Sequence, residues 1–147
     1  MRTLAIDLGT RRVGLALSDE GGRFATPYEV LTVSSAAQAV EPVVKIVEKE
    51  GVGRIVVGLP LNMDDTVGPA ARATIQWGRA LEKRAGKPVV FVDERLSSFA
   101  AEQHLIDRKR AGEKLTRQRK KQQLDALAAA GFLQAFLDGN LAALDVD

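Results

Sequence analysis

The sequence predicts an α/β protein built on a mixed five-stranded sheet with helices on both faces. Three observations lead to this fold class. Three apolar segments joined by short turns open the chain, which is typical of antiparallel strands. Strands then alternate with helices, a pattern that calls for parallel pairing and right-handed crossovers. The hydrophobic fraction of 46% and the charged fraction of 27% are those of an ordinary globular chain.

The first three strands are expected at residues 3–8, 13–18 and 26–33. The first two are nearly unbroken apolar runs, and residues 9–12 form the hairpin turn between them. A glycine-rich turn at 19–23 leads into the third strand. Because both connections are short, these strands form an antiparallel meander.

The rest of the chain alternates between buried strands and helices that end near a glycine. Pro42 falls inside the first predicted helix, so that helix either starts late or kinks there. The last residues, after Gly139, are expected to fray. The predicted elements are helix 36–50, strand 54–58, helix 69–84, strand 89–92, a helix from Ser97 or Ser98 to about residue 106, and helix 118–137.

The composition restricts the chemistry that the chain can perform. A length of 147 residues predicts one domain spanning 1–147. Cysteine is absent and His104 is the only histidine, which excludes disulfides, thiol nucleophiles and Cys- or His-rich metal sites. An enzyme of this composition must use carboxylates. Because no apolar stretch is long enough for a signal peptide or a membrane span, we expect a cytoplasmic protein without a membrane partner.

Basic side chains are concentrated in residues 108–121. This segment holds eight Lys and Arg residues and one acid, so its charge is +7 while that of the remaining chain is −5. Such asymmetry indicates a polyanionic partner, and nucleic acid is the candidate. A basic loop that is merely solvated is the simpler alternative. Within this segment, Arg117, Lys120 and Lys121 are candidates for contacts with nucleic acid.

Acidic residues occupy positions where acids are uncommon. Asp7 lies inside the apolar run of the first strand, and Asp125 lies on the apolar face of the last helix. Asp93 and Glu94 follow strand 89–92, at the carboxyl end where sites form in open α/β sheets. These two neighbours point to opposite faces of the sheet, and periodicity does not choose between them. At each position the alternative is a structural acid that accepts hydrogen bonds from a nearby turn.

Three carboxylates that converge on one end of the sheet predict a metal site. Converging carboxylates repel one another and raise each other's pKa. A hard divalent cation relieves this repulsion, so we expect Mg²⁺ or Mn²⁺, as one ion or two. A carboxylate-held metal beside a basic segment suits the hydrolysis of phosphodiester bonds, in which one ion generates the hydroxide nucleophile and another stabilises the leaving oxygen.

Four motifs occur in a recognisable order: IDLGTRRVGLALSD at 6–19, VVGLPLNMD at 56–64, VDERLSS at 92–98 and KKQQLDALAAAGFLQ at 120–134. Together they extend over about the whole chain, and the sequence resembles the YqgF/RuvX family of RNase H-like nucleases. Members of that family are described as Holliday-junction-resolvase-like proteins and as nucleases that process the 5′ end of precursor 16S rRNA. The resemblance implies an RNase H-like fold and a nucleic-acid substrate, either precursor rRNA or branched DNA.

The resemblance also assigns roles to residues of the four motifs. It implies that Asp7, Glu94 and Asp125 are the metal-binding catalytic acids, with Glu94 rather than its neighbour at the strand end. Pre-ribosomal particles are further expected partners, and we expect a monomer or a weak homodimer.

The same resemblance places further residues beside the expected site. Arg12, Asn62 and Arg95 stand at motif positions where contacts with nucleic acid are expected. One departure from the family pattern occurs after Asn62, where Asp64-Asp65 replaces the usual Asp-Gly. A second acid instead of glycine alters the turn and adds negative charge beside a phosphate track.

Two other functions account for parts of the sequence. The run at 7–10, DLGT, also looks like the first phosphate loop of sugar kinases and actin-like ATPases, but those proteins enclose ATP between two such domains and are far longer. A non-catalytic nucleic-acid or ribosome-assembly binder would keep the three acids as structural residues. Metal-dependent cleavage that is lost in Asp7→Asn distinguishes a nuclease from such a binder.

Overall fold

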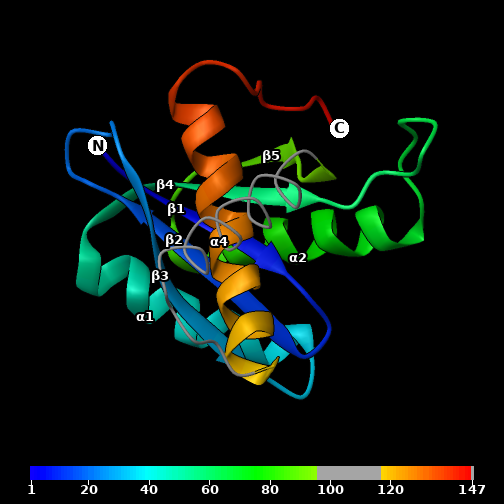
Figure 1. Cartoon of the computed structure of the whole chain (residues 1–147), viewed down its shortest axis with the longest axis horizontal. Coiled ribbons are helices and arrows are strands. Elements are labelled where there is room, and N and C mark those ends of the chain that lie inside the picture. Colours follow the sequence, from blue (N-terminus) through cyan, green and yellow to red (C-terminus); the bar gives the residue numbers. More distant parts are fainter. Residues whose placement is uncertain (96–116, 147) are drawn as a thin grey trace.

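The chain folds around a five-stranded mixed sheet with the strand order β3-β2-β1-β4-β5 (Figure 1). The computed structural model describes residues 1–95 and 117–146, with the side chains of 1–95 and 124–146. β1, β2 and β3 form the antiparallel meander, and β4 pairs in parallel with both β1 and β5, so the predicted sheet is confirmed. The strands are β1 (Arg2–Leu8), β2 (Arg12–Ser18), β3 (Ala25–Thr32), β4 (Val52–Leu59) and β5 (Val89–Asp93).

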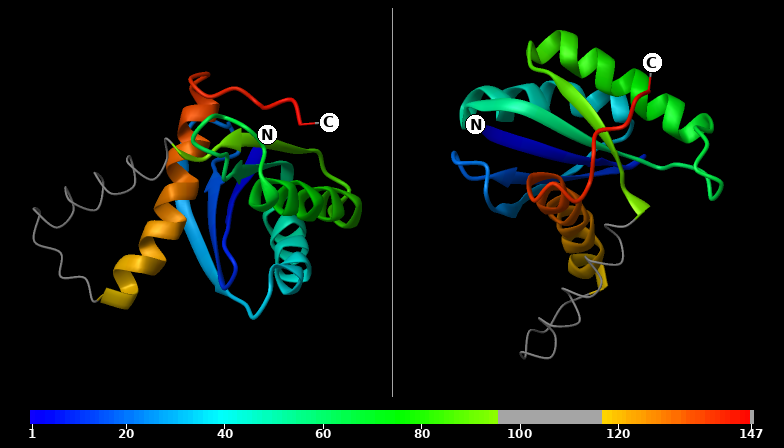
Figure 2. Two further views of the ribbon diagram at one scale, coloured as in Figure 1. Left: turned by 90° about the vertical axis from the view of Figure 1, so that its right-hand side faces the viewer. Right: turned by 90° about the horizontal axis from the view of Figure 1, so that it is seen from above.

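Helices cover both faces of the sheet, as the sequence predicts. α1 (Val40–Glu50) and α2 (Pro69–Ala85) lie on one face, and α4 (Arg117–Leu137) crosses the other (Figure 2). The contacts agree with this arrangement, because α1 and α2 touch β4 and α2 also touches β5, whereas α4 packs mainly on β2 and β3.

A hydrophobic core lies on each face of the sheet, and the core on the α4 face contains more small residues. β1 contributes to both, with Leu4 and Ile6 on the α1–α2 face and Ala5 on the α4 face. All three side chains are completely buried, so the apolar run of β1 is covered on both sides, as its sequence predicts. Because α4 packs over small strand residues such as Ala5 and Ala16, its backbone comes close to the sheet.

The first helix starts later than position 36. Residues Ala36–Ala39 form a short 3-10 helix, and α1 begins at Val40. Pro42 therefore falls in the first turn of α1, where a missing N–H costs no helical hydrogen bond. Of the two alternatives that the sequence left open, the late start is the one observed.

The end of the chain packs against the sheet, so the expectation that the last residues fray is wrong. The N–H of Leu144 donates to the carbonyl of Phe91 at 2.7 Å. Leu144 and Val146 also pack against the core of the α1–α2 face. β5 is an edge strand, and this tail covers part of its open backbone.

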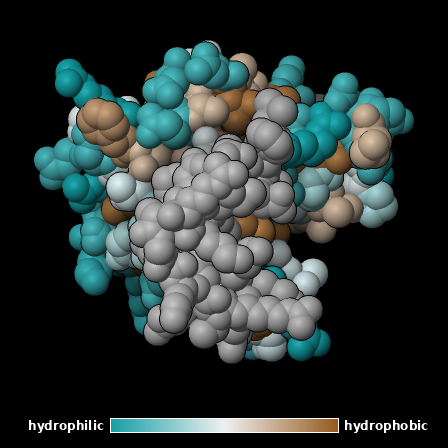
Figure 3. Space-filling model, in the orientation of Figure 1, coloured by the Kyte–Doolittle hydropathy of each residue, from teal (hydrophilic) through white to brown (hydrophobic). Residues whose placement is uncertain are grey.

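Hydrophilic residues predominate around the rim of the face seen in Figure 3, as expected when the apolar side chains fill the interior. Within the described part of the chain, every helix is too short or too polar to cross a membrane. The predicted helix from Ser97 or Ser98 and most of the basic segment 108–121 lie outside the described residues. The assignment of residues 1–147 to one domain stays a prediction.

Candidate active site

Asp7 and Glu94 lie side by side on the face of the sheet that α4 covers. The side chain of Asp7 follows that of Ala5 onto this face because side chains alternate along a strand. Glu94, directly after β5, follows Val92 in the same way. Asp93 belongs to the opposite face. The alternation therefore brings Glu94, and not Asp93, to Asp7.

Gly58 provides the space in which the two carboxyl groups meet. The parallel register of β1 and β4 places Gly58 next to Asp7. A Cβ atom on Gly58 would lie 2.9 Å from the Cβ of Glu94 and 2.9 Å from the ring of Phe132. The backbone N–H of Glu94 also donates to the carbonyl of Leu59 at 3.3 Å, which ties the end of β5 to the end of β4. Any larger residue at position 58 would displace the Glu94 side chain.

Asp7 and Glu94 share a hydrogen bond, and both have raised pKa values. Burial, which penalises the charged form, raises the pKa of Asp7 to about 6 against the opposing effect of the hydrogen bond from Glu94. Burial also raises the pKa of Glu94 to about 8, and the negative charge of Asp7 adds to this shift. These shifts favour a proton on Glu94, which the hydrogen bond shares with the Asp7 carboxylate.

Asp125 joins this pair from α4. Its negative charge contributes to the raised pKa of Asp7. Burial raises the pKa of Asp125 itself, and the Arg12 guanidinium opposes that shift. Nε of Arg12 lies 2.9 Å from Oδ2 of Asp125, so the two side chains form an ion pair.

Gly14 sets the distance between Asp125 and the sheet. It is the register partner of Asp7 in the antiparallel pair of β1 and β2. A Cβ atom at this position would overlap the backbone carbonyl of Asp125. The backbone of α4 therefore lies directly on β2, and the position of Asp125 depends on contact between two backbones.

The donor set of Asp7, Glu94 and Asp125 fits a hard divalent cation. Carboxylate oxygens are the ligands that Mg²⁺ and Mn²⁺ prefer. A cation would stabilise the charged forms of these buried carboxyl groups, whose pKa values are raised mainly by burial, and would replace Arg12 as the partner of the Asp125 oxygen. As they stand, the described side chains include no group of three that is arranged to hold a metal ion. A bound ion would therefore have to replace the Asp7–Glu94 hydrogen bond and the Arg12–Asp125 ion pair.

A pocket of about 340 Å³ opens beside Asp125. Its walls come from the β1–β2 turn, which the N–H of Gly9 closes by donating to the carbonyl of Arg12 at 2.9 Å. Two guanidinium groups at such a pocket suit a phosphate group. The predicted contact of Arg12 with nucleic acid stays a prediction. The lining residues are Gly9, Thr10, Arg11, Arg12 and Asp125.

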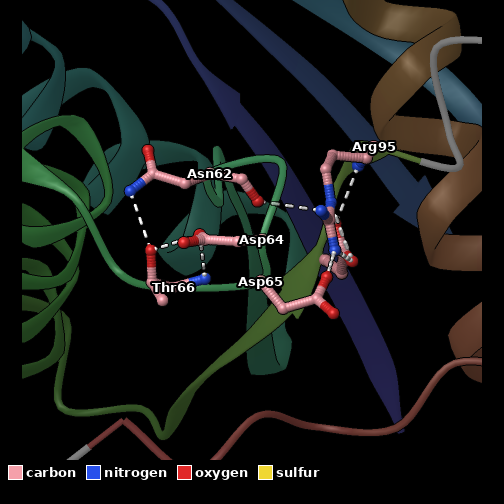
Figure 4. Close-up of polar contacts among 6 residues, drawn as sticks. Asn62, Asp64, Asp65, Thr66 and Arg95 are labelled. Atoms are coloured by element: carbon pink, nitrogen blue, oxygen red, sulfur yellow. Dashed lines mark hydrogen bonds and ion pairs between the residues drawn. The ribbon is translucent and has the colours of Figure 1, made fainter.

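Arg95 and Asn62, two further predicted nucleic-acid contacts, meet at the same end of the sheet (Figure 4). Nη1 of Arg95 donates to the backbone carbonyl of Asn62 at 2.9 Å, and Nε donates to Asp93 at 2.9 Å. Nη2 of Arg95 also pairs with Asp65. The hydrogen bond from Arg95 holds the pKa of Asp93 below its usual value. Asp93 is thus an ion-pair partner of Arg95.

The side chains of Arg117, Lys120 and Lys121 lie outside the described residues, so their contacts with nucleic acid stay predictions. Sequence reasoning missed the Asp65–Arg95 ion pair and did not anticipate that Arg12 faces Asp125. The sequence signal for the Asp65–Arg95 ion pair is the second acid of the loop, Asp65, which stands where the family pattern has glycine. The close packing around position 58 also has a sequence signal, because Gly58 interrupts a strand of β-branched residues.

Comparison with solved structures agrees with this fold. RuvC of Thermus thermophilus in complex with a Holliday junction substrate superposes with a TM-score of 0.61 and 20% identity, covering 98% of this chain and 99% of that one. Fowlpox virus resolvase with Holliday junction DNA gives a TM-score of 0.56 and 7% identity, covering 95% and 98% of the two chains. At these identities the likeness concerns the fold alone, which is RNase H-like.

Other proteins are much more similar to this chain in sequence than these solved structures are. A protein of Acidiphilium cryptum named "Putative pre-16S rRNA nuclease" is 40% identical over 137 residues, which are 93% of this chain and 84% of the relative. A protein of the same name from Maridesulfovibrio salexigens is 42% identical over 137 residues, which are 93% and 98% of the two chains. The family model described as "RuvX: Holliday junction resolvase" matches residues 1–139. With this match and these relatives, the chain belongs to the RuvX family.

Proposed function

We propose that this protein is a divalent-metal-dependent nuclease that hydrolyses phosphodiester bonds in structured nucleic acid. We further propose that its substrate is precursor 16S rRNA, which it processes at the 5′ end. Membership of a family of nucleases and resolvases supports a hydrolase acting on nucleic acid. The relatives at about 40% identity carry names that refer to pre-16S rRNA, which supports the RNA substrate.

The proposal is supported by the pairing of Asp7 with Glu94 and by the position of Asp125 on α4, which packs over the same face of the sheet. Asp7 comes from β1, Glu94 follows β5 and Asp125 comes from α4. A role in fold stability alone would not require two buried carboxyl groups with raised pKa values at one place. Mg²⁺ or Mn²⁺, as one ion or two, is the cofactor that such a group would hold.

Each of the three acids has a stated task in this proposal. Asp7 and Asp125 would provide anionic oxygens for the ion, and Glu94 would be a third ligand once it had lost the proton that it shares with Asp7. A divalent ion held here would supply an activated water and stabilise charge on the leaving oxygen. Arg12 and Arg11 present their guanidinium groups to a phosphate in the adjacent pocket.

Cleavage assays with the purified full chain test the proposal. A precursor 16S rRNA fragment and a four-way DNA junction are incubated with the protein in Mg²⁺, in Mn²⁺ and in EDTA. We expect metal-dependent cleavage of the RNA, and loss of cleavage in Asp7→Asn. Asp145→Asn, which removes one exposed carboxylate from the C-terminal tail, is the matched control and retains activity.

The alternatives give distinct results in the same assays. Preferential cleavage of the DNA junction would support a resolvase, the activity that the description of the family model names. Binding of RNA without cleavage in either metal would support a non-catalytic binder. Equal cleavage by the parent protein and Asp7→Asn would contradict the assignment of the three acids.

A further inference from the structure

Arg95 is held by two carboxylates of unequal exposure (Figure 4). Asp93 accepts from Nε of Arg95 at 2.9 and 3.1 Å and from Nη2 at 2.6 Å, which is a two-pronged contact. Asp65 contacts Nη2 alone. The side chain of Asp93 is 18% exposed and that of Asp65 is 77% exposed. Asp65 is therefore the more weakly held partner, because exposed ion pairs contribute little and are screened by salt.

The backbone of the loop delivers Asp65 to Arg95. Asp65 has a φ of +68°, a left-handed conformation that residues other than glycine, asparagine and aspartate seldom adopt. The N–H of Asp65 donates to the carbonyl of Asn62 at 2.9 Å, and the N–H of Asn62 donates to the carbonyl of Thr66 at 2.9 Å. The turn is thus closed on both sides of Asp65. Its neighbour Asp64 instead accepts hydrogen bonds from Thr66.

This arrangement lies at the same end of the sheet as the candidate active site. Arg95 directly follows Glu94, and the N–H of Glu94 donates to Leu59 at the start of the same loop. Arg95 has a planar, permanently charged group that binds carboxylates and phosphates with the same geometry. A phosphate that reached Arg95 would compete with Asp65 rather than with the more buried, two-pronged Asp93.

We propose that Asp65 occupies the place of a backbone phosphate on Arg95 and thereby limits the affinity of the protein for nucleic acid. Asp65 is thus an affinity-determining residue, displaced when nucleic acid binds. This inference rests on the nucleic-acid-binding function proposed above, and it requires no metal ion. Asp93 keeps Arg95 in position throughout the exchange.

The test compares Asp65→Asn with Asp64→Asn, two substitutions that make the same change in net charge on adjacent loop residues. Asparagine tolerates the left-handed conformation at position 65 and keeps an acceptor oxygen at position 64, so both variants retain the loop. Binding of a fluorescent RNA stem-loop and of a four-way DNA junction is measured by anisotropy in EDTA, which prevents cleavage. We expect Asp65→Asn to bind about two- to fivefold more tightly than the parent protein. Asp64→Asn should change the affinity by less than about twofold, since its charge acts only through screened solvent.

A double-mutant cycle assigns the gain to Arg95. In an Arg95→Gln background, Asp65→Asn and Asp64→Asn should have the same effect on affinity. Equal or weaker binding by Asp65→Asn in the parent background would overturn the inference, as would a gain that persists without Arg95. If the parent protein bound neither probe, the proposed nucleic-acid-binding function itself would be contradicted. This outcome is distinct from the one in which all variants bind with equal affinity, which contradicts only the role of Asp65.

Discussion

A proton shared between Asp7 and Glu94 makes the stability of the metal-free protein depend on pH. Both folded-state pKa values, about 6 and about 8, exceed the ordinary values of 3.8 and 4.5. Between the ordinary and the raised values, the folded chain binds more protons than the unfolded chain. The free energy of unfolding therefore decreases as the pH rises through this window. The lowered pKa of Asp93 acts in the opposite sense, but only in more acidic solution.

We predict that Glu94→Gln flattens this decrease. Glutamine can donate the same hydrogen bond to Asp7 without a proton that is lost at high pH. In EDTA, the parent protein should lose on the order of 5 kcal/mol between about pH 5 and about pH 8, and the variant should lose clearly less. Urea denaturation at the two pH values measures the difference. An equal loss in both proteins would show that Glu94 does not titrate in this range.

The sequence could predict that individual acids face the interior, but it could not predict what they contact. Asp7 and Asp125 were predicted from apolar surroundings, and the structure brings them together, while their catalytic roles stay predictions. Asp93 and Glu94 could not be separated by periodicity, since the choice depends on which face α4 covers. Asp65 was recognised only as an added charge, because the conformation of a loop residue depends on the turn around it.

At the scale of elements, the contact between β2 and α4 positions the candidate site. Gly14 has an ordinary φ, so its backbone conformation would accept an alanine. Only the lack of space for a Cβ atom opposes the substitution. The atoms that a Cβ would meet belong to the backbone of Asp125 and Ala126, which cannot rotate away. Helix α4 would have to move off the sheet, and Asp125 would move with it.

We therefore predict that Gly14→Ala destabilises the protein by about 1–3 kcal/mol and reduces cleavage more than stability alone explains. The matched control is Gly21→Ala in the exposed turn after β2, where a Cβ would meet only a terminal oxygen of Asp19 at 3.2 Å. Urea denaturation gives the loss of stability, and cleavage measured where both variants are fully folded gives the loss of activity. Wild-type cleavage in Gly14→Ala would show that the backbone contact does not position Asp125.

The elements themselves were largely predictable because each has its own local pattern. Alternating or continuous apolar residues identified the strands, and glycines identified the ends of α1 and α2, where Gly51 and Gly86 adopt positive φ. The start of α1 was less certain, since Pro42 permits both a late start and a kink. Local sequence does not decide between them, and packing against the sheet does.

At the scale of the whole molecule, the C-terminal tail covers part of the β5 edge of the sheet. It was expected to fray because the last residues of a domain are usually poorly ordered. Its order comes instead from contacts far away in the sequence, the Leu144–Phe91 hydrogen bond and the packing of Leu144 and Val146. Contacts of this kind cannot be predicted from the local pattern of a short tail.

We predict that a chain ending at residue 141 is less stable by about 1–3 kcal/mol and associates with itself through the uncovered edge of β5. Denaturation and light scattering measure the two effects. The comparison variant is Leu144→Ala, which loses the packed side chain but keeps the backbone N–H. Leu144→Ala should be less stable than the parent protein but should remain monomeric. If both variants associated, the association would result from the lost apolar side chain and not from the uncovered backbone.

The two faces of the sheet also differ in how well they tolerate substitutions of buried residues. Large aliphatic side chains fill the α1–α2 side, on the far side of the sheet from Asp7 and Glu94. On the side where those acids meet α4, small residues such as Ala5 and Ala16 line β1 and β2, and neither Gly14 nor Gly58 has room for a methyl group. Attempts to engineer heat resistance should therefore redesign the first side and leave the second untouched, since improvements there would come at the expense of the chemistry.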